Sequence, residues 1–193
     1  EIYFFNIGPY KREEDSYFEW NSRKFHKSSM FDVRMARNAP SKEIFYCMNK
    51  ADLKLVYFVM DETDTVFTIG ADPDVQSLLL EAILEYLMDE FFDMYDDSLL
   101  TTCYGEACNI FDGFSQVLLH SFKNYKDLDI FKLGRATCKS CGKTLTIIIK
   151  TSLIENSSKP TTPIVYIHSG HALLVYVDKQ YRVRGAELVS ISY

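Results

Sequence analysis

The sequence has no excess of basic residues. Its 193 residues include 21 Lys and Arg against 27 Asp and Glu, which gives a net charge of −6 and a pI near 5.2. Nucleic-acid-binding domains usually carry a basic patch, and the short basic run at 23–27 is offset by acidic residues elsewhere in the chain. We therefore expect no nucleic-acid partner.

Long apolar runs are also missing. A membrane-spanning helix needs about 20 consecutive apolar residues, and no stretch of the chain approaches that length. The apolar start at 2–7 is too short for the core of a signal peptide, and no basic residue precedes it. Five cysteines without a secretion signal favour a reducing compartment. We expect a cytoplasmic protein without a transmembrane segment, which would be peripheral to membranes through its partners.

Aromatic residues are abundant, at 15% of the chain with 14 Phe and 13 Tyr. This much ring area predicts a dense core, an aromatic contact surface, or both. The cluster of Tyr17, Phe18 and Trp20 lies near the edge of the predicted sheet. It is interpreted either as core packing or as a partner-binding surface, since aromatic rings are enriched at the energetic centres of interfaces.

Five short apolar runs predict the strands of an antiparallel sheet, at 1–7, 16–21, 44–48, 53–60 and 65–70. A short helix is expected within 30–36. The tripeptide Asp72-Pro73-Asp74 is typical of a helix start, with Asp72 as the cap and the proline in the first turn. Apolar residues with a period of 3.6 then predict one helix over 75–95 and a second over 107–125. The acidic residues opposite the first apolar stripe predict a solvated face, namely Glu81, Glu85, Asp89 and Asp93.

The composition changes after the second helix. Residues 134–193 contain four glycines and four runs typical of strands, at 145–149, 164–168, 173–177 and 188–191, and no helical period. We expect a domain at 1–128 and a small all-β appendage at 134–193. The segment Arg182-Val183-Arg184-Gly185 is read as a turn, or as a small basic loop for an acidic partner.

The order of these elements resembles the longin domains of adaptor small subunits and related trafficking proteins. The likeness is carried by the hairpin 53–72, by Leu79–Phe92, which looks like the first long helix of that family, and by Asn109–Asp112, which looks like the start of its last helix. The resemblance implies a longin or profilin-like five-stranded antiparallel sheet with helices on both faces. It further implies partner binding without catalysis. A roadblock-type fold is the nearest alternative.

The sharpest local motif is Cys138-Lys139-Ser140-Cys141-Gly142. A Cys-x-x-Cys-Gly turn is a common zinc-knuckle shape, because the glycine lets backbone N–H groups approach the thiolates. Zinc takes four ligands, and no second cysteine pair follows, so His168 and His171 are the candidates to complete a Cys2His2 set. A four-ligand site would be structural. A catalytic site would keep one position open and need a base such as Glu187 or Asp178.

Alternatives without a metal stay open for these cysteines. The pair could be two small buried thiols at a turn, or, less in keeping with the following strand, a redox dithiol. The remaining cysteines, Cys47, Cys103 and Cys108, are expected to be buried free thiols. Cys103 with His120 would give a nucleophile and a base, but nothing in the sequence orients that pair.

Two functions follow as expectations. The first is a non-enzymatic adaptor of longin type that binds a small GTPase or another longin or roadblock subunit in vesicle trafficking, as a homodimer or heterodimer. The second is a zinc-binding protein with its metal at Cys138, Cys141, His168 and His171. Zinc is the one cofactor expected, and a structural zinc is compatible with the first function.

Overall fold

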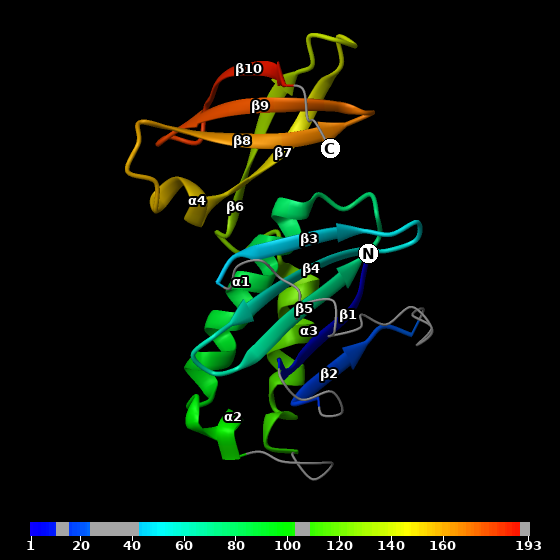
Figure 1. Cartoon of the computed structure of the whole chain (residues 1–193), viewed down its shortest axis with the longest axis vertical. Helices are drawn as coiled ribbons and strands as arrows, with labels where there is room; N and C mark the ends of the chain where they lie inside the picture. The colour runs from blue at the N-terminus through cyan, green and yellow to red at the C-terminus, as the bar shows by residue number, and fades with distance from the viewer. Residues whose placement is uncertain (11–15, 24–42, 103–108, 190–193) are drawn as a thin grey trace. The chain divides into compact units, whose positions relative to one another are not determined.

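The computed structural model describes residues 1–10, 16–23, 43–102 and 109–189. The chain divides into two compact units, Glu1–Leu128 and Asp129–Tyr193 (Figure 1). The short helix expected within 30–36 lies outside the described residues. In the described ranges, no helix combines the length and the apolar character that crossing a bilayer requires.

The described part of the first unit contains five strands, three α-helices and one 3-10 turn. They are β1 (Ile2–Pro9), β2 (Phe18–Asn21), β3 (Phe45–Asn49), β4 (Lys54–Met60), β5 (Thr65–Ala71), α1 (Ser77–Met94), α2 (Ser98–Thr102), a 3-10 turn at Asn109–Phe111 and α3 (Phe114–Asn124). The strands form one antiparallel sheet in the order β2-β1-β5-β4-β3. The predicted α+β class, with a five-stranded antiparallel sheet and flanking helices, is confirmed.

Helices α1 and α3 cover one face of this sheet (Figure 1). Phe91 of α1 is fully buried, with its ring centroid 5.8 Å from that of Phe67 on β5 and 5.3 Å from that of Phe114 on α3. Phe114 in turn lies 6.0 Å from Phe5 on β1. Aromatic residues of two helices and two strands therefore form the centre of this core, where each ring buries a large apolar area.

The opposite face of the sheet is also buried. Successive side chains of a strand point to opposite faces, so Tyr57 and Val59 on β4 point away from the helices while Phe58, which pairs with Phe67, points toward them. Tyr57 and Val59 form a buried cluster with Val66, and Tyr10 and Tyr46 pack against it. Burial on both faces explains why β4 and β5 are nearly continuous apolar runs.

The first helix begins later than predicted. Asp72 does not cap it, because α1 starts at Ser77 with Gln76 as the preceding residue. Instead the Asp72 carboxylate accepts the backbone N–H of Asp74 at 2.9 Å, and its carbonyl accepts the N–H of Val75 at 3.0 Å. The tripeptide at 72–74 thus forms a turn ahead of the helix, and Lys54 of β4 holds that turn through the carbonyl of Val75 at 2.5 Å.

The second predicted helix is also shorter than the 107–125 expected. The described part of this segment consists of the 3-10 turn at Asn109–Phe111 and of α3, with Gly113 between them. A glycine lowers helix stability, and Asn109 and Asp112 favour local turn hydrogen bonds. The backbone N–H of Asp112 bonds to the carbonyl of Asn109 at 3.2 Å, which closes the turn.

The second unit contains two antiparallel sheets and one short helix. Its elements are β6 (Phe131–Thr137), β7 (Thr144–Lys150), α4 (Thr151–Glu155), β8 (Thr161–His168), β9 (His171–Asp178) and β10 (Val183–Val189). Strands β6 and β7 form a hairpin, and the other three form a sheet in the order β10-β9-β8. Strand β6 was not predicted, and it begins ahead of the expected boundary at 134.

The expectation of an all-β appendage is wrong in one respect, because α4 follows β7 directly. This helix has only five residues, too few for a 3.6-residue period to be visible in the sequence. Ile154 of α4 is buried, and Lys179 donates to its carbonyl at 2.5 Å from beyond β9. Tertiary contacts therefore stabilise a helix that no pattern in the local sequence predicts.

Asp178 closes the turn between β9 and β10. Its Oδ1 accepts the backbone N–H groups of Gln180 and Arg182, both at 2.9 Å, and its Oδ2 accepts the Nε–H of Arg184 at 2.5 Å. The pKa of Asp178 lies below its ordinary value, chiefly because the backbone N–H of Arg182 stabilises the carboxylate. Burial raises this pKa, and the hydrogen bond from Arg184 lowers it further. The segment 182–185 is accordingly the end of a turn and the start of β10.

Replacing Asp178 with Asn should lower the thermal unfolding midpoint of the second unit, and the loss should depend on pH. A carboxyl whose pKa is depressed in the folded state adds stability above its unfolded pKa, near 3.8, and loses that stability as the pH falls through the folded pKa. Wild type and variant should differ at neutral pH and converge in acid, as unfolding followed at a series of pH values would show.

Asp129→Asn is the matched control for this substitution. It removes the same charge from an ion pair with Lys132, but the Asp129 side chain is 82% exposed. Such exposed pairs add little to stability, so this variant should unfold close to wild type at every pH. If the unfolding midpoint of Asp178→Asn stayed below that of wild type by the same amount down to acidic pH, the role given to the Asp178 carboxylate would be contradicted.

Candidate metal centre and apolar groove

The turn between β6 and β7 holds Cys138 and Cys141. The backbone N–H of Cys138 donates to the carbonyl of Lys143 at 2.9 Å, and the N–H of Gly142 donates to the carbonyl of Cys138 at 2.8 Å. Gly142 has a φ of 71°, in the left-handed region that glycine adopts without a steric cost. The predicted Cys-x-x-Cys-Gly turn therefore folds the two sulfur atoms back toward each other.

The turn between β8 and β9 holds the two histidines. His168 and His171 are the last paired residues of the two strands, and Ser169 and Gly170 connect them with φ angles of 47° and 77°. Two consecutive positive φ angles are typical of the two-residue hairpin turns that match the twist of a sheet. The tight turn places both imidazole rings at the same end of the hairpin, with centroids 5.9 Å apart.

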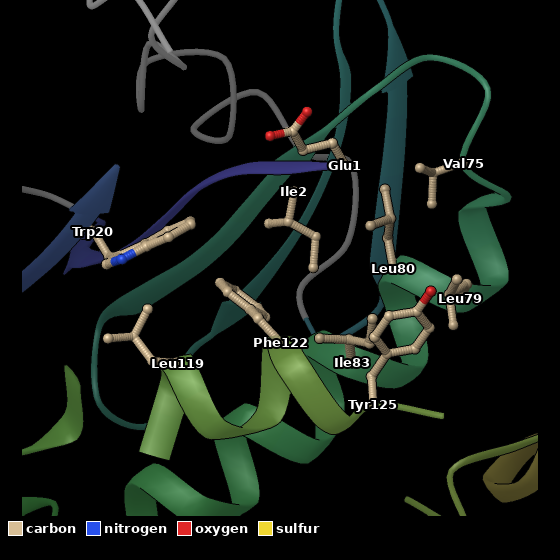
Figure 2. A pocket seen from close by; sticks show the side chains of 10 residues that line it. All are labelled: Glu1, Ile2, Trp20, Val75, Leu79, Leu80, Ile83, Leu119, Phe122 and Tyr125. Carbon is tan, nitrogen blue, oxygen red and sulfur yellow. The ribbon is translucent and has the colours of Figure 1, made fainter. Parts of the chain in front are cut away.

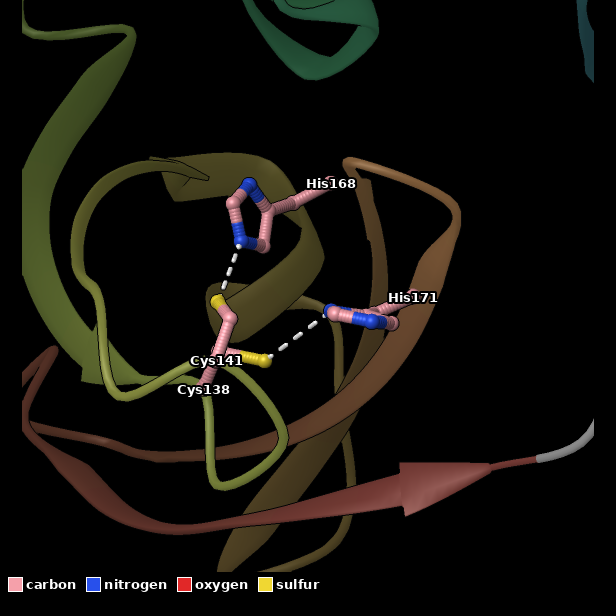
Figure 3. Close-up of side chains that lie close together, drawn as sticks. All are labelled: Cys138, Cys141, His168 and His171. Atoms are coloured by element: carbon pink, nitrogen blue, oxygen red, sulfur yellow. Dashed lines mark hydrogen bonds between the residues drawn. The ribbon is translucent and has the colours of Figure 1, made fainter.

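The structure brings all four predicted residues together (Figure 3). Their ligand atoms all lie within 4.8 Å of one another. The Sγ of Cys141 is 3.1 Å from Nε2 of His168, and the Sγ of Cys138 is 3.5 Å from Nδ1 of His171. With Zn–S near 2.3 Å and Zn–N near 2.0–2.1 Å, a tetrahedral site separates its ligand atoms by roughly 3.3–3.8 Å. The four side chains are thus close enough to hold a metal ion.

Two serines orient the histidines. The Oγ of Ser169 lies 3.2 Å from Nδ1 of His168, and the Oγ of Ser140 lies 3.2 Å from Nε2 of His171. In each ring the serine meets the nitrogen that faces away from the cysteine sulfur. Such contacts fix the tautomer and the rotation of a metal-binding histidine. Nε2 of His168 and Nδ1 of His171 are therefore the atoms presented to the site.

The two thiols differ in their surroundings. Cys138 is fully buried, whereas Cys141 is exposed. The backbone N–H of Cys141 is the largest cause that holds the pKa of Cys138 below its ordinary value, burial opposes it, and the N–H of Ser140 adds to the lowering. Hydrogen bonds from backbone N–H groups stabilise a thiolate, which is the form that binds a metal.

Four protein ligands would leave no open position for a substrate. Of the two bases considered for a catalytic site, Asp178 is held by Arg182, Gln180 and Arg184 at the far end of β9. Glu187 lies in β10 opposite Leu174, in the middle of β9. If all four residues held one ion, neither candidate base would stand beside an open coordination position.

The three aromatic residues proposed for partner binding occupy different environments. Tyr17 and Phe18 are each 6% exposed. Tyr17 packs against Phe111 and Phe18 against Phe5 and Phe114, with centroid distances of 5.4–6.1 Å. These contacts fit the core-packing interpretation for both residues. Trp20 is half-buried, and its ring lies 5.1 Å from that of Phe122 on α3.

Trp20 lines an apolar groove of about 300 Å³ in the first unit (Figure 2). The groove lies between the start of β1, the N-terminal half of α1 and the C-terminal half of α3. Its walls are mostly aliphatic and aromatic, formed by Glu1, Ile2, Trp20, Val75, Leu79, Leu80, Ile83, Leu119, Phe122 and Tyr125. Leu119 remains 51% exposed at its rim. The sequence pointed to Trp20 but to no other residue of this groove as a binding residue.

The other candidate residues are not brought into a common site. Cys47 is exposed, contrary to the burial expected for it, and contacts Ser77 Oγ at 3.1 Å. Cys103 and Cys108 lie outside the described residues, and His120 is exposed and contacts Asn124 of its own helix. On α1, Asp89 and Asp93 are exposed, as predicted, while Glu81 and Glu85 are half-buried.

Ser140 and Ser169 were missed at the sequence level. Each lies between the two ligands of its own turn, so their positions were a signal that could have been used. Comparison of the chain with models of known protein families finds no match, and comparison with curated proteins finds none.

Proposed function

We propose that the second unit binds one zinc ion as a structural centre. The observation that carries this proposal is the convergence of Cys138, Cys141, His168 and His171, whose ligand atoms lie within 4.8 Å of one another although they come from two separate turns. Two thiolates and two imidazoles in a tetrahedral arrangement suit zinc better than harder cations, which prefer oxygen ligands. The serine contacts to both histidines support the same reading.

The role of the ion would be to join the two turns. The β6–β7 turn and the β8–β9 turn belong to different sheets of the second unit. A metal bound by one cysteine pair and one histidine pair would cross-link these sheets at one end. A preformed site rarely exists in an unfolded chain, so the binding free energy of the ion becomes folding free energy.

Cobalt substitution tests the ligand set. Co²⁺ loaded into the apoprotein should give the visible absorption of a tetrahedral site, together with sulfur-to-cobalt charge transfer from two thiolates. His168→Ala should weaken these bands, and Cys47→Ser should leave them unchanged because Cys47 is an exposed thiol in the first unit. A spectrum typical of six oxygen or nitrogen ligands would contradict the proposal.

We also propose that the first unit is a non-enzymatic interaction module of longin type. The antiparallel order β2-β1-β5-β4-β3, with α1 and α3 on one face, is compatible with that resemblance. The observation that favours binding is the apolar groove at Trp20, since monomeric proteins rarely leave such concave apolar surface uncovered without a use. Its partner would be a small GTPase or a second longin or roadblock subunit, and a second copy of the chain would give a homodimer.

Leu119→Glu should weaken binding of that partner by about thirtyfold or more. The new carboxylate would lose its hydration when the partner covers the groove. Residues at the centre of an interface commonly contribute about 2 kcal/mol or more, which sets the expected size of the effect. The measurements are the molar mass in solution and the affinity for a panel of purified small GTPases. Ile110→Glu is the control, since Ile110 is 49% exposed and lies outside the groove. A monomer that binds no small GTPase would count against this function.

A further inference from the structure

Charge is divided unequally between the two units. The second unit contains nine Lys and Arg against four Asp and Glu, a net charge of +5, whereas the first unit contains twelve against 23, a net charge of −11. These values add to the −6 of the whole chain. A strong charge asymmetry within a chain indicates a polyanion-binding part. The expectation that nucleic acid is not a partner rested on the whole-chain charge, which conceals the basic unit.

Most acidic side chains of the second unit are already engaged. Asp129 pairs with Lys132, Asp178 with Arg184, and Glu155 accepts the hydroxyl of Tyr181 at 3.0 Å. The sequence has no acidic residue between Asp129 and Glu155, the stretch that forms the β6–β7 hairpin. The basic residues of this hairpin therefore lie on strands and a turn that carry no carboxylate of their own.

One face of the hairpin presents cations and hydroxyl groups together. Arg135 pairs with Thr146 and Thr137 with Thr144 across the two strands, and alternation along each strand puts all four on the same side. All four are exposed, and the hydroxyl oxygens of Thr137 and Thr144 lie 3.2 Å apart. Their exposure shows that this is the face turned away from buried Ala136 and Ile147.

The turn at the end of the hairpin adds two more cations. Lys139 lies between the two cysteines, Lys143 follows them after Gly142, and both lysines are exposed. In the described part of the second unit, no ion pair involves Arg135, Lys139 or Lys143. The hairpin thus offers a row of three uncompensated cations with threonine hydroxyl groups between them.

We propose that this face of the β6–β7 hairpin binds the phosphate backbone of a nucleic acid without sequence preference. Arg and Lys together with Ser and Thr hydroxyls are the groups that contact phosphate oxygens in such complexes. The one aromatic residue of these two strands is Phe131, which is half-buried at the start of β6, far along the strand from the turn, and the exposed apolar residue of this face is Leu133. An extended row of cations suits a linear polyanion. This binding goes beyond both functions proposed above and uses none of the four proposed metal ligands.

The test compares two double variants of the full chain. Arg135→Gln with Lys143→Gln removes two cations from the hairpin. Lys159→Gln with Arg182→Gln removes the same charge from the second unit outside the hairpin, at residues for which no ion pair is described. The probe is a labelled mixed-sequence single strand of about 20 nucleotides, and its affinity is measured by fluorescence anisotropy between about 50 and 200 mM salt.

Wild type should bind with an affinity that falls steeply with salt, since each neutralised phosphate of a single strand adds about 0.7 to the logarithmic slope. The hairpin variant should bind roughly ten to thirtyfold more weakly near 0.1 M salt, with a slope smaller by about 1.4. The control variant should stay within about threefold of wild type, because charges beyond about 10 Å are screened at that salt concentration. Both variants should keep the wild-type unfolding midpoint.

Three results would overturn the proposal. The first is no binding of the oligonucleotide by wild type at about 50 mM salt. The second is an equal loss of affinity in both double variants, which would show that binding depends on the net charge of the second unit and not on the hairpin. The third is equal or tighter binding of poly-glutamate, or of vesicles rich in anionic lipid, which would identify an acidic protein or a membrane surface as the partner.

Discussion

Replacing Cys138 with Ser should abolish stoichiometric zinc binding and unfold the second unit while the first stays folded. Cys138 is the buried ligand of the proposed site, and its loss would leave three ligands. A domain of fewer than about 70–80 residues rarely gains more than about 3–5 kcal/mol from its core alone, whereas a structural zinc supplies apparent binding free energies of about 10–16 kcal/mol. The stability of Asp129–Tyr193 should therefore depend on the metal.

Hydrogen exchange resolved by peptide separates the two units in this experiment. Protection should be lost in β6, β7, β8 and β9 and retained in β1, β4 and β5. A chelator added to wild type should produce the same pattern. Cys47→Ser, which removes an exposed thiol of the first unit, should leave protection unchanged in both units. Full protection of the second unit in the Cys138 variant would contradict a structural role for the ion.

Replacing Phe91 with Ala should destabilise the first unit by about 3–5 kcal/mol. Phe91 is fully buried and contacts aromatic rings from β5, the 3-10 turn and α3, with centroid distances of 5.8 Å to Phe67, 5.2 Å to Phe111 and 5.3 Å to Phe114. Truncation removes its own transfer free energy and leaves a cavity that rigid rings on three elements cannot fill. Denaturant unfolding monitored by the fluorescence of Trp20 reports on this unit.

Phe92→Ala is the control for the cavity. The neighbouring ring is half-buried and lies 5.7 Å from Phe67, so its truncation removes apolar area without opening an enclosed space. The expected loss is about 1–2 kcal/mol. Similar losses in the free energy of unfolding for both variants would mean that Phe91 does not occupy the centre of the core.

The sheet and the long helix were predictable from the sequence because their patterns are local. The apolar runs at 53–60 and 65–70 match β4 and β5 within one residue, and the 3.6-residue stripe of 75–95 contains all of α1. The helix ends were not predictable. Asp72 has the residue type of a cap, but its side chain serves a turn that Lys54 holds from the neighbouring strand, and that contact is tertiary.

The candidate metal ligands could be chosen from the sequence, but their geometry could not. The Cys-x-x-Cys-Gly motif identifies one half, and His168 and His171 were paired with it by counting ligands. The two turns meet because the β6–β7 hairpin packs against the β8–β10 sheet. No local sequence pattern predicts that packing. The groove could not be predicted, because its walls are mostly apolar residues of β1, β2, α1 and α3, and the spacing of these residues is that of ordinary core residues.

The basic hairpin shows what a whole-chain average of charge conceals. Net charge described the acidic first unit and concealed five basic residues between Asp129 and Glu155. The face that Arg135 shares with the threonines became apparent only from the register of β6 and β7, which places Arg135 beside Thr146.

Elemental analysis of the purified chain for zinc tests the central claim most directly. We predict about one zinc per chain, removed by chelation together with the folded state of the second unit. A chain free of metal whose second unit remains protected from hydrogen exchange would contradict the account. Cys138 and Cys141 would then be two thiols at a turn, next to two histidines with no ion between them.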